Sequence, residues 1–558
     1  MSQRRSWWSV FLVAAVLLMP GAWAAADGLR FDVSIPRSVS AEPVTGRLLI
    51  AIAKRETPEP RLAIGLNGPM ILGVDLEQLP PGQVASVDAK AVSYPLASLA
   101  ELPAGDYFVQ ATLIRYGQVR RADGHTLWVP TQHRRMPYHV LPGNLFSKAQ
   151  KLHLDPKAAN APRFELTETV ALIEEPKDTE WLRHVRIKSK ILSDFWGTPV
   201  YLSATALVPR DFDKHPKTRY PTLYAQSQER TRPFYFNPDP ASHEGELGLR
   251  AQNVQTGYEF YQSWISDDLP RFVVIVMEQS SPYFLEAYSV DSANHGPYGK
   301  ALTEELMPYL EKKFRLIPQS YARIVEGAST GGWESLALQL KYPDYFGGAW
   351  IFNPDPIDFT HYQLMNIYKD ENAFMLPNTP FTNAERPMRR TVEGQVAYTF
   401  REIARLEATL GSKGRSGYQF DAWQSVHGPV GPDGYPVMLF DKLTGVIDRN
   451  VANYYREHGY DLTEYTRRNW STLGPKLVGK LNFFAGEMDN FYLNLGVYDF
   501  EAMLKDTKDP HYPGRFEYGR PKQGHSWHLT DFAEMIREMA AHVKKNAPAG
   551  ADVASWNY

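Results

Sequence analysis

One serine, set between glycines where two sequence patterns meet, constrains the fold most. Residues 322–342 read ARIVEGASTGGWESLALQLKY, so a short apolar run leads into Gly-x-Ser-x-Gly around Ser329 and a helix-like pattern follows. A strand, a glycine-lined turn and a helix in this order predict a nucleophile elbow, in which Ser329 has a strained backbone and the glycines leave room for the helix. The alternative is a glycine-rich turn that merely contains a serine, because such a motif also occurs by chance in long chains.

Alternating strand and helix patterns surround this motif between residues 160 and 545. Continuous apolar runs typical of buried parallel strands are PTLYAQ, RFVVIVMEQ, FGGAWIFNP and KLNFFAG. Helical patterns occupy 303–314 and 333–342. Before them, RHVRIKSKIL and VYLSATALVP read as two long strands joined by a turn, SDFWGTP. The pattern predicts an α/β class with a mostly parallel sheet flanked by helices.

A long interruption, residues 356–475, separates two of these predicted strands. It holds a helical segment at 394–410, a loop rich in glycine and proline at 427–436, and more helix near 447–458. It is too long for a plain connection, and it carries Trp423 and His427. We interpret it as a lid over the site; a purely structural embellishment is the alternative.

Residues 27–155 show a different pattern, of short alternating runs separated by turn clusters. The runs are LRFDVSI, GRLLIAIA, DYFVQATLIRY and HTLWVP, and no long helical period interrupts them. Several short strands with regular turns predict an accessory β-sandwich domain of immunoglobulin-like type. At the other end of the chain, residues 546–558 read as a loose tail.

The first 24 residues have the pattern of a secretory signal peptide. A basic start, MSQRR, precedes the apolar run WWSVFLVAAVLLM and the small-residue site AWA. We therefore expect a bacterial periplasmic or secreted protein with no stable membrane span after cleavage. Export by the twin-arginine route, from Arg4 and Arg5, and a retained membrane anchor are the alternatives. The chain has no cysteine, which excludes disulfides and thiol chemistry.

Composition excludes some partners and favours others. The formal net charge is -3, and no cluster of basic residues follows the N-terminus, so we expect no nucleic-acid partner. Aromatic residues make up 13% of the chain, which suits sugar or aryl substrates or simply a large aromatic core. The oligomeric state does not follow from the sequence.

A serine nucleophile needs a base, and the base needs an orienting acid. In a hydrolase of this type the acid and then the histidine follow the serine along the chain. Asp489 comes directly after the predicted strand KLNFFAG and is the first choice for the acid, with Glu487 as the alternative. His525, in the late loop GRPKQGHSWHL, is the first choice for the base, with His528 as the alternative. The amide of Thr330, at the start of the helix, is placed to donate to an oxyanion.

Three segments, EGASTGGWESLAL, GEMDNFYL and GHSWH, resemble in this order the esterase D and enterochelin-esterase type of α/β-hydrolases. The resemblance covers about residues 180–545 and is specific in the elbow and the Gly-His-Ser-Trp segment. It implies an α/β-hydrolase fold with Ser329, Asp489 and His525 as the catalytic triad. Many members of this group also carry an extra N-terminal β domain.

The chain departs from this family after the predicted strand PTLYAQ. Members commonly have a His-Gly there, whose backbone amide completes the oxyanion hole, whereas this chain continues with SQERTRPF. The amide of Ser227 or of Gln226 is the candidate replacement. The side chains of Gln226 and Gln228 are alternatives as donors.

Four further residues are candidates for binding the substrate. Asp355 and Asp358 follow the strand after the elbow helix, and either one is also an alternative to Asp489 as the acid. His295 lies in a long loop that contains several tyrosines, and Trp333 begins the elbow helix. No zinc or calcium motif occurs, so no metal and no cofactor are expected.

Together these patterns predict an exported serine esterase. The expected substrates are acyl or aryl esters of carbohydrates, or esters of the siderophore type. Two alternatives remain: a peptidase that uses the same triad, and a catalytically silent binding protein that uses its β domain.

Overall fold

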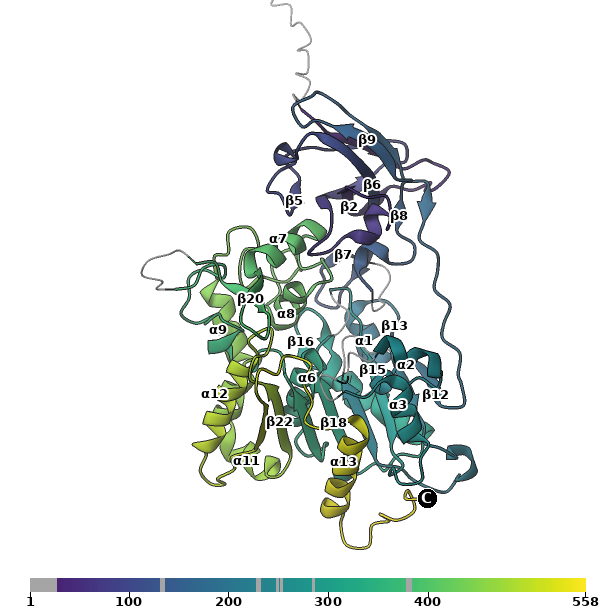
Figure 1. The fold of residues 1–558 in the computed structure, drawn as a ribbon, viewed down its shortest axis with the longest axis vertical. Coiled ribbons are helices and arrows are strands. Elements are labelled where there is room, and N and C mark those ends of the chain that lie inside the picture. Colours follow the sequence, from purple (N-terminus) through teal and green to yellow (C-terminus); the bar gives the residue numbers. More distant parts are fainter. Residues whose placement is uncertain are drawn as a thin grey trace, which may run out of the picture.

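The computed structural model of the chain describes residues 28–130, 136–226, 232–246, 250, 254–283, 287–377 and 384–558. Figure 1 shows a β-rich N-terminal part at one end of a larger α/β part. The predicted signal segment lies outside the described residues. No helix in the described part of the chain is long and apolar enough to cross a membrane.

The N-terminal part consists of two sheets around one apolar core. Its strands are β1 (Phe31–Ser34), β2 (Val44–Ala53), β3 (Met70–Leu79), β4 (Val84–Val87), β5 (Val92–Tyr94), β6 (Gly105–Arg120), β7 (Thr126–Pro130), β8 (Leu145–Phe146), β9 (Gln150–Leu154), β10 (Arg163–Glu165) and β11 (Glu168–Thr169). One sheet has the order β10-β1-β4 and the other β11-β8-β6-β2-β3-β5, with β7 and β9 also paired to β6. Phe31 of the first sheet and Leu48 of the second share the buried core, as in a β-sandwich.

Strand β2 is buried along its whole length because both of its faces are covered. Leu48 and Ile50 point into the core of the sandwich. Leu49 and Ala51, on the opposite face, belong to the large core that continues into the rest of the protein. Two covered faces remove the usual alternation, which explains why this strand reads as a continuous apolar run.

The α/β part is built on one eight-stranded sheet. Its strands are β12 (Leu182–Ser189), β13 (Val200–Leu207), β14 (Thr222–Gln226), β15 (Val273–Glu278), β18 (Arg323–Ala328), β19 (Gly348–Phe352), β22 (Leu481–Gly486) and β23 (Arg515–Gly519). They lie in the order β12-β13-β15-β14-β18-β19-β22-β23. Strand β13 is antiparallel to both neighbours, and the pairs from β15 to β23 are parallel. The carboxyl ends of β14, β18, β19, β22 and β23 therefore meet at one edge, where sites in such sheets form.

Helices connect these strands. They are α1 (Lys190–Trp196), α2 (His243–Glu246), α3 (Gly257–Trp264), α4 (Tyr298–Ala301), α5 (Met307–Lys313), α6 (Thr330–Lys341), α12 (Asn494–Lys505) and α13 (Phe532–Asn546). A five-residue π-helical stretch, Leu302–Leu306, joins α4 to α5, so that the predicted helix at 303–314 begins earlier than expected. The mostly parallel sheet with flanking helices confirms the predicted α/β-hydrolase class.

The prediction of a simple turn between the first two strands of this sheet was wrong. Residues 190–196 form helix α1, which Ser189 caps by accepting a hydrogen bond from the amide of Leu192 at 3.0 Å. The helix ends at Gly197, whose φ of 64° suits glycine. The two strands still pair antiparallel, from Leu182 opposite Leu207 to Ser189 opposite Val200.

Between β19 and β22 lies the predicted insertion. Its described residues contain a two-stranded hairpin and five α-helices: β20 (Pro387–Arg390), β21 (Val396–Thr399), α7 (Phe400–Leu410), α8 (Gln419–His427), α9 (Arg449–Glu457), α10 (Leu462–Arg468) and α11 (Trp470–Leu477). In Figure 1 helices α7 and α8 lie between the N-terminal sandwich and the main sheet. Glycine-rich loops surround α8, as the sequence suggests.

Two buried or half-buried arginines join the sandwich to the insertion. Arg47 of β2 donates to the carbonyls of Ala408 and Thr409, at the last turn of α7, at 2.9 and 3.0 Å. Arg405 of α7 donates in return to the carbonyls of Ser93 and Ala97 at 2.8 and 2.6 Å. A cation at the carboxyl end of a helix satisfies carbonyls that have no partner in the helix. These hydrogen bonds fix helix α7 of the insertion against the N-terminal sandwich.

The C-terminal tail is packed, contrary to the prediction of a loose segment. Trp556 is fully buried, and its carbonyl accepts a hydrogen bond from the amide of Arg271 at 3.0 Å. The hydroxyl of Tyr558 lies 2.9 Å from that of Tyr220. One buried tryptophan was too weak a pattern to predict this docking from the sequence.

Candidate active site

Ser329 lies between β18 and α6 in a strained conformation, with φ 57° and ψ -121°. Its amide donates to the carbonyl of Phe352 in the next strand at 3.0 Å. Its carbonyl accepts from the amides of Gly332 and Trp333 in α6 and from that of Asp355. A non-glycine residue with positive φ is costly and persists only where its surroundings fix it. The strand, turn and helix thus form the sharp elbow that the sequence indicates.

The glycines on either side of Ser329 are required by close backbone approach. A Cβ on Gly331 would lie 2.1 Å from the carbonyl oxygen of Gln226, at the end of β14. A Cβ on Gly327 would lie 2.3 Å from the carbonyl oxygen of Gly331. Real Cβ atoms do not approach backbone this closely, so only glycine lets β14 and the elbow meet.

Asp489 and His525 lie against each other at the ends of β22 and β23. Asp489 Oδ2 is 2.7 Å from His525 Nδ1, and its other oxygen accepts from the amides of Phe491 and Leu493 at 2.8 and 3.2 Å. The Asp489 side chain is fully buried. The amide of His525 donates to Asn490 Oδ1 at 3.0 Å, which fixes the loop that carries the imidazole.

The pKa of His525 is raised above its ordinary value. Burial alone would lower it, but the negative charge of Asp489 and the hydrogen bond to it outweigh burial, and Asp355 adds a smaller effect of the same sign. The pair therefore stabilises a proton on the imidazole, as a general base requires after it has taken one.

The two alternatives from the sequence lie elsewhere. Glu487 accepts from the amide of Lys522 at 2.8 Å and forms an ion pair with Arg520. His528 stacks on the ring of Phe352, with ring centroids 4.6 Å apart.

The hydroxyl of Ser329 donates to Asp355 Oδ1 at 3.3 Å. Both residues are described, as is His525, and no hydrogen bond joins Ser329 to His525 in this structure. Hydrogen bonds between a nucleophile and its base are often loose before substrate binds, so this arrangement is compatible with catalysis. It gives Asp355 a place beside the nucleophile.

Asp355 Oδ2 accepts hydrogen bonds from four side chains that come from three segments. They are Thr330 at 2.9 Å, Tyr288 at 3.0 Å, Trp423 at 3.1 Å and Gln419 at 3.2 Å. Burial raises the pKa of Asp355, and the hydrogen bonds from Thr330, Trp423 and Tyr288 oppose that rise. Tyr288 lies in the tyrosine-containing loop that was a candidate part of the site, but neither Tyr288 nor Gln419 could be singled out from the sequence, because their segments are far from Asp355 along the chain.

Comparison with known proteins finds a family match for part of the chain. Residues 203–386, about a third of the chain, match the family described as "Putative esterase". The match supports an esterase of the α/β-hydrolase type for this part of the chain. No curated protein matches its sequence.

Many solved structures resemble the chain at low identity. A ferulic acid esterase is 15% identical over 65% of this chain and 98% of its own, with a TM-score of 0.31. An S-formylglutathione hydrolase from Staphylococcus aureus is 13% identical over 65% of this chain and 99% of its own, with a TM-score of 0.32. Prolyl oligopeptidase B from Galerina marginata is 11% identical over 85% of this chain and 47% of its own, with a TM-score of 0.33. Similarity this low carries no assignment of substrate.

Ser329 lines a cavity of about 480 Å³. Three parts of the chain line it: the N-terminal sandwich, the insertion and the loops at the end of the sheet. The lining residues are Leu66, Asn67, Ser329, Asp355, Gln363, Met388, Arg389, Ala397, Tyr398, Ile403, Tyr418, Gln419, Trp423, Phe491 and Leu493. Most are apolar or aromatic, as in pockets that bind small organic molecules. No local pattern at Leu66 or Asn67 could have revealed their part in the site.

The structure describes two of the candidate residues for the oxyanion hole, Thr330 and Gln226. Thr330 is the first residue of α6, directly after Ser329. Gln226 ends β14 against the elbow; its side chain is buried, and its Oε1 accepts from Ser289 at 3.0 Å. Its Nε2 has no acceptor among the described residues. Ser227 and Gln228 lie outside the described residues.

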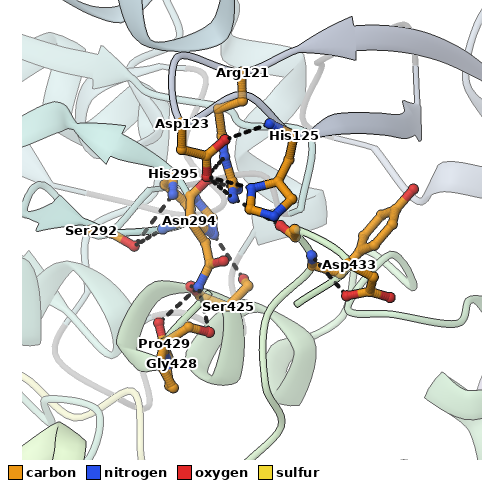
Figure 2. Close-up of polar contacts among 12 residues, drawn as sticks. Arg121, Asp123, His125, Ser292, Asn294, His295, Ser425, Gly428, Pro429 and Asp433 are labelled. Atoms are coloured by element: carbon orange, nitrogen blue, oxygen red, sulfur yellow. Dashed lines mark hydrogen bonds and ion pairs between the residues drawn. The ribbon is translucent and has the colours of Figure 1, made fainter. Parts of the chain in front are cut away.

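His295 and Trp333 are buried outside the cavity. His295 contacts the hydroxyls of Ser281 and Ser425, each at 2.8 Å, and burial lowers its pKa to about 3. Figure 2 shows it beside Asn294, where the hairpin that carries Arg121 meets the insertion. The ring of Trp333 packs edge-on against Tyr288, with centroids 5.6 Å apart. Neither residue is among the described residues that line the Ser329 cavity.

Asp358 lines a second, more polar cavity of about 830 Å³, away from Ser329. Its carboxylate accepts from the amide of Thr360 at 2.9 Å. Asp461 lines the same cavity, and burial together with the charge of Asp358 raises its pKa well above the ordinary value. Two carboxylates that share a site disfavour each other's ionised form.

This pair predicts a stability change in the variant Asp358→Asn. The raised pKa of Asp461 means that its protonated form stabilises the fold at low pH, and that this contribution is lost as pH rises through the folded-state value. Removing the charge of Asp358 lowers the folded-state pKa of Asp461, so less stability is lost as pH rises. We expect Tm to increase relative to wild type by a few degrees at pH 8 and to be nearly unchanged at pH 4, as measured by thermal unfolding. An equal increase at both pH values would contradict the electrostatic explanation.

Proposed function

We propose that this esterase cleaves its substrates through an acyl-enzyme formed on Ser329, with His525 as the base and Asp489 as the orienting acid. The observation that carries the proposal is the Asp489 to His525 contact of 2.7 Å beside an elbow serine with φ 57°. The three residues follow strands β18, β22 and β23 of one sheet, in the chain order expected for this type of enzyme.

The geometry supports the following mechanism. Ser329 Oγ attacks the ester carbonyl while its proton moves to His525 Nε2, and Asp489 Oδ2 holds the proton on Nδ1 and stabilises the imidazolium. The amide of Thr330 and a second donor at Gln226 or Ser227 stabilise the oxyanion, each by about 10² to 10³ in rate. His525 then protonates the leaving alcohol, and water hydrolyses the acyl-enzyme by the reverse sequence.

The walls of the cavity support a substrate with an apolar or aromatic group. Tyr418, Trp423 and Phe491 present aromatic surface there, and Leu66 of the N-terminal sandwich adds apolar surface. Such walls suit aryl or acyl esters of carbohydrates, or siderophore-type esters, better than very polar acyl groups. A periplasmic or secreted location is part of the proposal and rests on residues 1–24 alone.

The proposal is tested by labelling the purified protein with a fluorophosphonate probe, which phosphonylates an activated serine. Wild type is expected to label, whereas Ser329→Ala and His525→Ala are not. Ser471→Ala, an exposed serine of α11, is the control and should label as wild type does. Labelling of Ser329→Ala at the wild-type rate would overturn the assignment of the nucleophile.

A further inference from the structure

The two carboxylate oxygens of Asp355 have different environments. Oδ2 accepts the four hydrogen bonds from Thr330, Tyr288, Gln419 and Trp423, which fix the orientation of the side chain. Oδ1 accepts one hydrogen bond among the described residues, from Ser329 at 3.3 Å. The residue is 4% exposed and lines the Ser329 cavity. Oδ1 therefore has capacity for a further donor on the side of Ser329.

A buried carboxylate at this position opposes the chemistry of a plain ester. Negative charge develops on the carbonyl oxygen as Ser329 attacks, and a nearby anion in a poorly solvated site disfavours that charge. Among the described residues, no lysine or arginine forms an ion pair with Asp355. Once the Ser329 proton has moved to His525, Oδ1 also loses its hydrogen-bond donor, and an unpaired buried anion is costly.

A hydrogen-bond donor on the substrate offsets both the repulsion between Asp355 and the oxyanion and the loss of the Ser329 hydrogen bond at Oδ1. During attack the carbonyl carbon is bonded to Ser329 Oγ, so a substituent on the adjacent carbon lies about two bonds away from the new bond. An oxygen 3.3 Å from Oγ is then within hydrogen-bond reach of a hydroxyl or ammonium on that carbon. Such a group would take the place at Oδ1 that the Ser329 hydroxyl leaves.

We propose that Asp355 Oδ1 binds a hydroxyl or ammonium group on the carbon next to the scissile carbonyl, so that the preferred substrates are esters of α-hydroxy or α-amino acids. The proposal rests on the function proposed for Ser329, Asp489 and His525. The aromatic walls at Tyr418 and Phe491 suit an apolar side chain on the same acid. Asp355 then determines specificity, while the triad carries the reaction.

Three esters of one alcohol test the inference on the full-length protein. They are the 4-nitrobenzyl esters of 3-phenylpropanoic acid, of its 2-hydroxy derivative and of its 2-amino derivative. We expect kcat/KM of wild type to be at least about tenfold higher for one or both donor-bearing esters than for the plain ester, the ratio that one hydrogen bond to a charged group provides. The two donor-bearing esters distinguish a hydroxyl from an ammonium site.

Two variants separate recognition from structural support. Asp355→Asn keeps the size and the acceptor for the four donors but removes the charge, and it is expected to reduce the donor preference to about threefold or less while it still hydrolyses the plain ester. Gln419→Met removes one of the four hydrogen bonds at Oδ2, together with the contact of Gln419 with the Tyr288 hydroxyl, and leaves Oδ1 unchanged, so the donor preference should remain. If Asp355 were merely structural, both variants would lower kcat/KM for all three esters by the same factor.

The outcomes also separate this inference from the proposed function. Wild type that labels with the fluorophosphonate probe but hydrolyses the three esters equally well, or hydrolyses none of them, overturns the inference and leaves Ser329 as the nucleophile. Wild type that neither labels nor hydrolyses any ester overturns the proposed function, and the inference with it.

Discussion

Asp489→Asn is expected to lower kcat by about 10⁴-fold while the protein stays folded. Asp489 Oδ2 lies 2.7 Å from His525 Nδ1, and its Oδ1 accepts from the amides of Phe491 and Leu493. Asparagine can keep the two amide contacts with its carbonyl oxygen. Its NH₂ group would then face Nδ1 and stabilise the tautomer that has no free Nε2 lone pair to take the Ser329 proton.

The pH profile gives this prediction a second readout. His525 acts as a base only when neutral, so kcat/KM decreases as pH falls through its pKa. Asp489 raises that pKa, which places the acid limb of wild type above the ordinary histidine value of about 6.5. Without the charge of Asp489, burial lowers the pKa, and the acid limb of Asp489→Asn should shift to lower pH.

Glu487→Gln is the matched control, since it neutralises a carboxylate two residues away. Glu487 contacts the amide of Lys522 and the guanidinium of Arg520 rather than His525. We expect its kcat to remain within about threefold of wild type, as for a surface substitution. A loss in Glu487→Gln as large as that in Asp489→Asn would contradict the assignment of the acid. Steady-state kinetics from pH 5 to pH 9 on all three proteins provide both measurements.

Local sequence patterns predicted the fold class because each pattern reflects a steric or burial requirement of the element that it forms. The elbow needs glycine at Gly327 and Gly331, since any Cβ there would meet backbone, and this requirement is visible in the sequence. The buried strands of the parallel sheet are apolar on both faces and read as continuous runs. The order of serine, acid and histidine follows from the order of strand ends, which brings Asp489 to His525. Their catalytic roles stay predictions until the variants are measured.

Contacts between distant segments were not predictable in the same way. Leu66 and Asn67 reach the cavity from a loop of the sandwich, and nothing in that loop differs from an ordinary turn. The four donors to Asp355 come from α6, α8 and the loop around Tyr288, so no sequence spacing relates them. Asp358 looked equivalent to Asp355 in sequence, yet it lines the other cavity. Asp358 follows Asp355 by three residues in an irregular loop, and this separation is enough for the two side chains to face different cavities.

Lys442→Met is expected to lower the free energy of unfolding of the insertion by about 3–5 kcal/mol. In the described structure, Lys442 is the only cation that contacts the two buried carboxylates Glu407 and Asp421, so the variant leaves both without a counter-ion. The ammonium of Lys442 lies 3.2 Å from Glu407 and forms an ion pair with Asp421. The side chains of both carboxylates are fully buried. Glu407 also accepts from the amides of Phe420 and Asp421 at 2.8 and 3.0 Å, so it fixes the first turn of α8.

The loss of stability in Lys442→Met should depend on pH. Burial raises the pKa of Glu407, and Lys442 opposes that rise. Without Lys442 the pKa rises further, so protonation relieves the uncompensated charge and the variant regains stability as pH falls. We expect the difference in Tm between wild type and Lys442→Met to be largest at pH 8 and smaller at pH 5. Thermal unfolding at both pH values measures it.

Two further variants decide whether charge is the cause. Lys442→Met combined with Glu407→Gln and Asp421→Asn removes all three charges, and it should recover most of the lost stability, because neutral groups of similar volume often replace buried ion pairs without loss. Lys190→Met removes an exposed lysine that pairs with Asp194, and it should not change Tm measurably. Because α8 carries Gln419 and Trp423, which hold Asp355, Lys442→Met should also reduce the preference for donor-bearing esters at pH 8. If the triple variant were as unstable as Lys442→Met, the lysine would act through its packing and not through its charge.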